Sequence, residues 1–535
     1  MLETPTIPIK KPTHSAPDWL GAVYLAVSWT WCIGIFLPVI LVRDFGWAGW
    51  IVFAIPNIVG AAAFGWFVRD RDHVDRLLAA HQPVFVAFSL VTIAFQVFFV
   101  TWFFGRLNML AAMVACLILA GTVRVLGERR RGLDTLAAAT GFFLSLVILV
   151  WWIVHLLGTP AASTVEPAPW TDFSRHVFIR PGFGVIGLST VCIFGFALCP
   201  YFDLTFYAAR RDMSAGSAHR AFGWGFGFFF LLMILLSLAY APTVAAAMAG
   251  HTTSTLVMRL VAIHIVVQIA LTIAFHARAT LDRLSDRRGP MVLGSTVGAG
   301  ILIGAVALAI GPVFGLTAGG STALTAGELV YRLFMSFYGL IFPAYAWICM
   351  LANFRNPSPP SSARIRVTVV AIAIAAPMFA MGFIAGHTIW LIPGIAVVLL
   401  SPLTTMRKVP HRPIIPPAAN RTRMDRLLIG HPLADNDLFL FPGVFCFGRS
   451  RSSGKTVSWP ISRHATRLAR LLGDTEWPAR PQSRPLNPPL DRLYCRPASS
   501  RTNRTFPLIA WPPSSAPARA VTSTSSRPIS ANSMP

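Results

Sequence analysis

Apolar residues gather into twelve stretches, most of them about 20 residues or longer, along the first 403 positions of the chain. A helix rises 1.5 Å per residue, so about 20 residues cross the roughly 30 Å hydrocarbon core of a bilayer. The expected spans are 19–42, 47–68, 83–104, 108–126, 133–157, 183–207, 220–248, 256–277, 291–315, 324–352, 366–385 and 387–403. The last two are separated only by residues 386–388, so they form either a hairpin or one interrupted segment. The pattern predicts an all-α integral membrane protein with about 12 transmembrane helices.

Composition supports this interpretation. Of 535 residues, 55% are hydrophobic and only 12% are charged, which is about half the charged fraction of an average soluble domain. These values exclude a soluble enzyme, a disordered scaffold and a coiled coil. The seven cysteines lie mostly in apolar stretches and lack CxxC spacing, so they are interpreted as small buried residues. They indicate neither a disulfide framework nor a metal site.

The arginines between the spans alternate in number, which predicts the orientation of the chain. Five alternate loops carry 17 arginines, at 69–76, 124–131, 210–220, 278–288 and 355–366, whereas the opposite loops carry four. Loops that stay in the cytoplasm hold the excess of Lys and Arg. We therefore expect a multi-pass protein of the cell (inner) membrane with both termini in the cytoplasm.

The C-terminal part of the chain differs from the rest. Residues 404–535 are rich in Arg, Pro and Ser, and from Pro402 onward 20 Lys and Arg face 6 Asp and Glu. Such a composition cannot bury enough apolar surface to offset chain entropy, so we expect a disordered cytoplasmic tail. The same bias is typical of a misread frame of GC-rich DNA, and no activity is assigned to the tail. Three regions result: a cytoplasmic N-terminal segment 1–18, a membrane domain 19–403 and the tail 404–535.

Asp203 is the polar residue whose placement within the bilayer costs the most free energy. It follows Pro200 in the sixth span and precedes Thr205. A carboxylate within a span requires water, an ion or a cation, and the proline frees a backbone carbonyl nearby. Asp203 and Thr205 therefore predict a site for a coupling ion, Na⁺ or H⁺. The alternative is that Asp203 lies near the cytoplasmic end and pairs with the arginines at 210 and 211.

Other polar positions predict contacts for a solute or between helices. Ser28, Thr30 and Gly34 precede Pro38 in the first span, as a broken helix requires, and broken helix ends offer N–H groups and carbonyls to a ligand. Asn57 and Gln96 add amides in the second and third spans, as solute contacts or as links between helices.

Two further pairs of polar residues are interpreted as structural. His264 and His276 of the eighth span stand beside no carboxylate at metal-ligand spacing, which favours helix packing. Glu328 and Arg332 share one face of the tenth span and predict a neutralised pair.

One motif resembles a known family. Gly34-Ile-Phe-Leu-Pro38, followed by Gly46-Trp-Ala-Gly49-Trp, resembles the start of amino-acid/polyamine/organocation transporters, whose first helix carries a glycine-rich break. The family's fuller glycine pattern is missing, because Trp31 and Cys32 stand where small residues are usual. The resemblance implies a LeuT-type fold, in which a 5+5 inverted repeat is followed by two helices, and alternating access.

The function expected from these observations is secondary active transport. A small polar or organic solute, amino-acid-like or cationic, would bind between spans one, three, six, eight and ten, and a Na⁺ or H⁺ gradient would drive it. The sequence predicts no catalytic residue, no cofactor, no metal site and no nucleic-acid partner; partners would be the lipid bilayer and the solute. The alternative is a non-transporting sensor or scaffold whose tail engages a cytoplasmic partner.

Overall fold

The computed structural model describes residues 17–129, 132–158, 183–251, 253–284, 288–318 and 322–406. All of them belong to Met1–Phe439, one of two compact units of the chain. Most of the expected N-terminal segment and nearly all of the expected tail lie outside the described residues, so both stay predictions.

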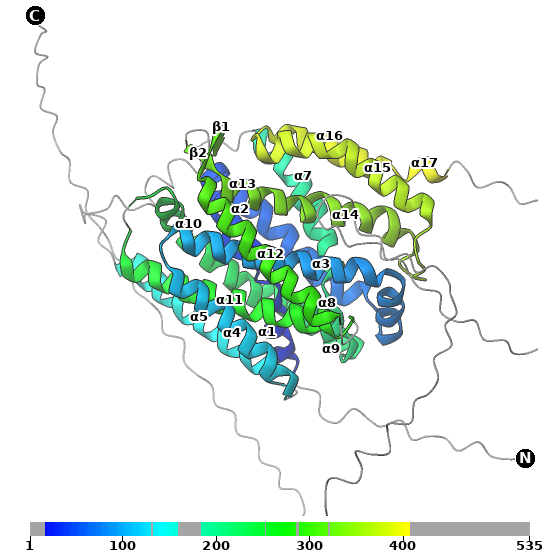
Figure 1. Cartoon of the computed structure of the whole chain (residues 1–535). Helices are drawn as coiled ribbons and strands as arrows, with labels where there is room; N and C mark the ends of the chain where they lie inside the picture. The colour runs from blue at the N-terminus through cyan, green and yellow to red at the C-terminus, as the bar shows by residue number, and fades with distance from the viewer. Residues whose placement is uncertain are drawn as a thin grey trace, which may run out of the picture. The chain divides into compact units, whose positions relative to one another are not determined.

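Helices make up nearly all of this unit (Figure 1). The first half of the chain forms α1 (Asp18–Trp29), α2 (Cys32–Phe67), α3 (Arg71–Arg106), α4 (Leu110–Arg129), α5 (Leu133–Gly158), α7 (Phe183–Leu198), the 3₁₀ turn η1 (Cys199–Phe202) and α8 (Leu204–Arg211). The second half forms α9 (Ala215–Trp224), η2 (Gly225–Phe230), α10 (Leu231–Met248), α11 (Thr255–Leu281), α12 (Gly289–Ile310), α13 (Ala326–Ser336), η3 (Phe337–Ile341), α14 (Phe342–Tyr345), η4 (Ala346–Met350), η5 (Leu351–Asn353), α15 (Ser362–Phe379), η6 (Ala380–Ile384), η7 (Thr388–Trp390), α16 (Leu391–Leu400) and α17 (Leu403–Met406).

Ten helices in the described part of the chain are long and apolar enough to cross a membrane. The expected twelve spans agree with this number once two features are considered. The 36-residue α2 bends at Gly46, whose φ of 64° is readily adopted only by glycine. The part before Gly46 forms span one together with α1, and the part after Gly46 is span two. The twelfth expected span is the shorter apolar segment Thr388–Leu400, which follows a turn at Gly386. The last two spans are therefore separate helices.

A small β-hairpin was not expected. The ninth span ends at Ile310 instead of residue 315, and Gly311 adopts a φ of 70°. Strands β1 (Pro312–Ala318) and β2 (Thr322–Thr325) then pair antiparallel and lead into α13.

Several helices contain π turns, in which one extra residue widens the helix. They are η2, η3, η4 and η6. Two of them, η3 and η4, flank the four-residue α14, so the tenth span is irregular over most of its second half.

Helix α3 lies at the centre and its neighbours surround it. Of the 18 most apolar consecutive residues of α3, 78% are buried, compared with 17% for the same length of α4 and 22% for that of α12. In Figure 1, α15 and α16 lie along one edge, whereas α4 and α5 lie along the other. Glycines allow the closest helix crossings: a side chain at Gly60 of α2 would collide with the backbone of Phe196 in α7. This contact holds α7 against α2 just before the chain of α7 breaks.

Candidate functional site

The first span is interrupted at Thr30 and Trp31, between α1 and α2. The indole Nε1 of Trp31 donates to the Ser28 carbonyl (2.8 Å), and the indole Nε1 of Trp29 donates to Asn57 Oδ1 (2.7 Å). The break therefore lies within the stretch from Ser28 to Pro38, as expected, but about one turn before Gly34, which already lies inside α2.

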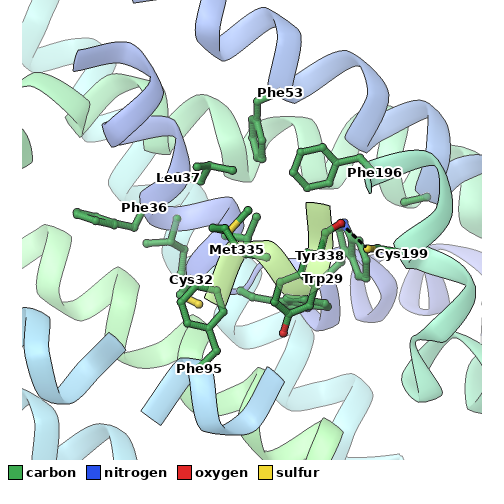
Figure 2. Close-up of a cluster of buried hydrophobic side chains, with 14 of the residues drawn as sticks. Trp29, Cys32, Phe36, Leu37, Phe53, Phe95, Phe196, Cys199, Met335 and Tyr338 are labelled. Carbon is green, nitrogen blue, oxygen red and sulfur yellow. Dashed lines mark hydrogen bonds between the residues drawn. The ribbon is translucent and has the colours of Figure 1, made fainter. Parts of the chain in front are cut away.

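The cause of this shift is aromatic packing. The rings of Trp29 and Trp31 lie 4.5 Å apart, Trp29 contacts Phe206 at 5.1 Å, and Trp31 contacts Phe88 and Tyr338 at 5.5 and 5.3 Å. Buried aromatic side chains contribute much of a core's stability, so the two indoles hold the chain in its extended form here. Figure 2 shows Trp29 and Tyr338 among the side chains that converge on this break.

The sixth span is interrupted where the sequence predicted it. Pro200 lies in η1, between the end of α7 and Asp203, and the fully buried Asp203 caps the N-terminus of α8. Its Oδ1 accepts hydrogen bonds from the backbone N–H and the hydroxyl of Thr205, both at 2.7 Å. A carboxylate suits this position because it satisfies free N–H groups at the positive end of the helix.

The second oxygen of Asp203 faces a histidine and not an arginine. Oδ2 has no hydrogen-bond partner, and it lies 3.7 Å from Nε2 of His276, which also has none. Arg210 instead donates to the carbonyls of Val68 and Met213, both at 2.8 Å. Arg211 pairs with Asp75 of α3 at 3.4 Å. The alternative that Asp203 pairs with these arginines is therefore wrong.

His276, which the sequence suggested serves helix packing, also faces the carboxylate of Asp203, and this position was not expected. Both it and Asp203 are completely buried, and its ring meets Trp31 edge-on at 5.5 Å. Its Nδ1 lies 3.4 Å from the Ser89 hydroxyl of α3. Each unsatisfied buried polar atom costs about 1–3 kcal/mol, so a proton, water or ion bound between these two atoms would be stabilising. The pair lies beside both helix breaks.

The predicted solute contacts are distributed unevenly. The hydroxyls of Ser28 and Thr30 donate to carbonyls of their own helix, at 3.0 and 2.7 Å. Asn57 is engaged by Trp29, as described above. Gln96 accepts a hydrogen bond from the Thr272 hydroxyl, and its Nε2 is buried without a partner. The structure brings Gly34 and Asn57 to one cavity and leaves Gln96 outside the residues that line it.

Two cavities lie near the breaks. The smaller, about 10 Å³, is lined by both tryptophans of the break, Gly34, Asn57 and Tyr338 among others, and it holds about one water. The larger, about 310 Å³, lies between α2, α7, the tenth span and α15. Its walls are mostly apolar, with Ser336 and Arg332 as polar exceptions. Figure 2 shows Leu37, Phe196, Met335 and Tyr338, which belong to the lining of the larger cavity, close to the break.

Ion pairs close one end of the bundle, which we call the Arg43 end. Arg43 bonds Glu328 at 2.6 Å, and Arg332 bonds Asp44 at 2.7 Å and Glu328 at 2.9 Å. The expected Glu328–Arg332 pair is confirmed and belongs to a larger neutral cluster. The cluster joins the first span to the tenth.

Hydrogen bonds close the opposite end. His73 Nε2 lies 2.7 Å from the Phe354 carbonyl, and His81 Nδ1 lies 3.0 Å from the Tyr345 hydroxyl. These contacts join the start of α3 to the end of the tenth span. Within the described residues there is no group of three His, Cys, Asp or Glu side chains that could hold a metal ion.

No protein-family model and no curated protein matches this chain. Several solved structures are similar to this chain, and two of them follow. One is Mhp1, a nucleobase-cation-symport-1 family transporter in a closed conformation with bromovinylhydantoin bound. The two sequences are 11% identical, the match covers 75% of this chain and 95% of the Mhp1 chain, and the TM-score is 0.42. The other is a mutant manganese transporter of Eremococcus coleocola, 12% identical over 73% of this chain and 94% of its own, with a TM-score of 0.37. Both of these proteins are transporters.

Proposed function

We propose that this chain is a secondary active transporter of the cytoplasmic membrane. It would carry a small polar or organic solute, amino-acid-like or cationic, and a Na⁺ or H⁺ gradient would drive it. One observation carries the proposal: Asp203 is a fully buried carboxylate with an unpartnered oxygen, at a helix break that lies beside a second helix break. A merely structural carboxylate would have both oxygens paired.

The two interruptions supply the means to bind and to move. Broken helices expose backbone groups at membrane depth, where a solute or ion replaces water as their partner. The breaks occur in spans one and six, the equivalent positions of a 5+5 repeat. Ser28, Thr30, Gly34, Asn57 and Gln96 are the solute contacts under this proposal, and Asp203 with Thr205 forms the coupling site. The proposed orientation, with both termini in the cytoplasm, rests on the arginine distribution.

Uptake by the purified full-length protein in proteoliposomes tests the proposal. A panel of radiolabelled amino acids, amines and nucleobases is offered with a Na⁺ gradient, a pH gradient or neither. We expect gradient-dependent accumulation of at least one solute, and at least a tenfold loss in Asp203→Asn, since one charge-assisted hydrogen bond of about 1.5–3 kcal/mol corresponds to that factor.

Asp72→Asn is the matched control. Asp72 is an exposed carboxylate in the first turn of α3, and its neutralisation leaves the helix breaks untouched. Uptake in Asp203→Asn equal to that of the Asp72→Asn variant would remove Asp203 from the site. A parent protein that accumulates no solute but retains a cytoplasmic partner would favour the scaffold alternative.

A further inference from the structure

One face of α11 carries a polar side chain at every fourth position. An α-helix has 3.6 residues per turn, so these positions form a stripe that winds slowly around the helix. Every member is completely buried. The stripe consists of His264, Gln268, Thr272, His276 and Thr280. From the first histidine to the second it extends about 18 Å along the helix axis.

The stripe meets polar groups from α5 at one end. Nδ1 of His264 lies 2.8 Å from the Ser145 hydroxyl. The amide of Gln268 donates to the same hydroxyl and to the Gly141 carbonyl, both at 3.0 Å. These contacts connect the two members of the stripe through one shared oxygen.

At the other end the stripe meets α3 and the break of the sixth span. The Thr272 hydroxyl donates to Gln96 Oε1, Ser89 lies beside Nδ1 of His276, and Nε2 of His276 faces Asp203. Three elements that are far apart in the sequence therefore converge on a single helix face.

Five polar atoms along this face are buried without a hydrogen-bond partner. They are His264 Nε2, Gln268 Oε1, Gln96 Nε2, His276 Nε2 and Asp203 Oδ2. Polar residues that only pack two helices together pair their donors and acceptors with each other. Unpaired donors and acceptors that follow one another along a helix face indicate water molecules that bridge them.

We propose that this face of α11 is a hydrated proton path that ends at Asp203. A proton from water at the His264 end passes through bridging waters and the imidazoles. It then moves from Nε2 of His276 to Oδ2 of Asp203, leaving a neutral imidazole and a neutral carboxylic acid. The coupling ion under this proposal is H⁺, because one free carboxylate oxygen beside an imidazole nitrogen lacks the set of oxygen ligands that Na⁺ requires.

Phenols, thiols and one ion pair, Arg278 of α11 with Asp134 of α5, flank this path. Tyr24 of α1 and Tyr338 of η3 lie near Asp203, and the Tyr240 ring of α10 lies 5.9 Å from that of His264. Within the described residues, the basic side chain within 4 Å of the Asp203 carboxylate is that of His276, at 3.7 Å. Arg278, which lies two residues after His276, pairs with Asp134 and not with Asp203.

Histidine C2 hydrogen–deuterium exchange on the reconstituted parent protein tests whether water enters the path. This exchange requires solvent at the imidazole. We expect His264 and His276 to exchange at a rate within tenfold of the exposed His251, although both are fully buried in the structure. No detectable exchange at the two buried histidines would overturn the proposal.

A pH jump tests whether the path carries protons. The fluorescence of Trp31, whose ring contacts His276, should be quenched when the imidazole is protonated, and His276→Gln should abolish this component. Gln268→Leu should slow the quenching at least tenfold without moving its midpoint pH, and Gln268→Glu should restore the rate. Ser237→Ala is the control, because Ser237 is equally buried but lies on α10. A Gln268→Leu variant that is as fast as the parent would refute the path.

The proposal rests on the proposed function only for the use of the proton, and neither measurement requires a solute. A failed uptake screen would refute the transporter and leave the path intact. Absent C2 exchange at the two histidines, or a quenching rate that Gln268→Leu leaves unchanged, would refute the path and leave a transporter that uses another ion.

Discussion

The ion cluster at the Arg43 end should contribute substantially to stability, and Glu328→Gln measures its contribution. Glu328 accepts hydrogen bonds from two arginines, Arg43 at 2.6 and 3.0 Å and Arg332 at 2.9 and 3.2 Å. Its side chain is only 9% exposed, compared with 27% for Arg43 and 7% for Arg332. The substitution keeps the shape of the side chain but leaves two arginines against one carboxylate, Asp44.

The magnitude follows from burial. Breaking a buried ion pair costs about 3–5 kcal/mol, and partial exposure of Arg43 reduces this value. We expect Glu328→Gln to lower the free energy of unfolding by about 2–4 kcal/mol, measured by SDS titration from mixed micelles. A double-mutant cycle with Arg43→Gln isolates the coupling between the two side chains.

Glu128→Gln is the control for this prediction. Glu128 pairs with Arg124 at 2.8 Å, but the two side chains are 48% and 29% exposed. Such a pair contributes about 0.3–0.5 kcal/mol. If Glu328→Gln costs no more than Glu128→Gln, or if the coupling with Arg43 vanishes, the cluster does not fasten the first span to the tenth.

Three other outcomes are expected. Gly60→Ala pushes a methyl group into the backbone of α7 and should lower the midpoint of thermal unfolding in detergent by several degrees. Gly294→Ala is the control, because a methyl group there meets nothing within 4 Å, and equal midpoints for the two variants would contradict the close crossing of α2 and α7. The Ser217 hydroxyl, and then the Arg220 guanidinium, hold the pKa of Asp18 below its ordinary value. The contact between α1 and α9 therefore stabilises the protein above about pH 4, and this stabilisation is lost as the pH falls. Asp18→Asn should remove this pH dependence from the free energy of unfolding measured between about pH 3 and 6. Truncation after residue 410 should leave membrane insertion and uptake unchanged, and a truncated protein that inserts but is inactive would give the tail a role.

The helical spans could be predicted from the sequence because a bilayer demands a fixed length of apolar helix. The break of the sixth span was predictable for a similar reason: Pro200 removes a local hydrogen bond, and Asp203 is a favourable cap three residues later. Both signals are local, so they require no knowledge of the fold.

The break of the first span and the role of His276 depend on contacts between distant residues. Trp29 and Trp31 determine where the helix is interrupted through their packing against other spans, whereas Gly34 alone only permitted a break. His276 acquires its role from Asp203, which lies on another span. One signal was present in the sequence, namely the four-residue spacing of polar residues along α11, but apolar residues around the rest of the helix obscured it.

The π turns of the tenth span affect how its length can vary. Each π turn contains one residue more than the α-helix around it, so loss of one residue within Phe337–Ile341 or Ala346–Met350 allows that turn to close as an ordinary helix. The side chains of the flanking turns then keep their orientation toward the neighbouring helices, and the Tyr331 hydroxyl can still donate to the Cys32 carbonyl. A deletion inside α13 instead rotates one part of the span against the other by about 100°. Single-codon deletions in this span should therefore be tolerated in two short windows and eliminated elsewhere.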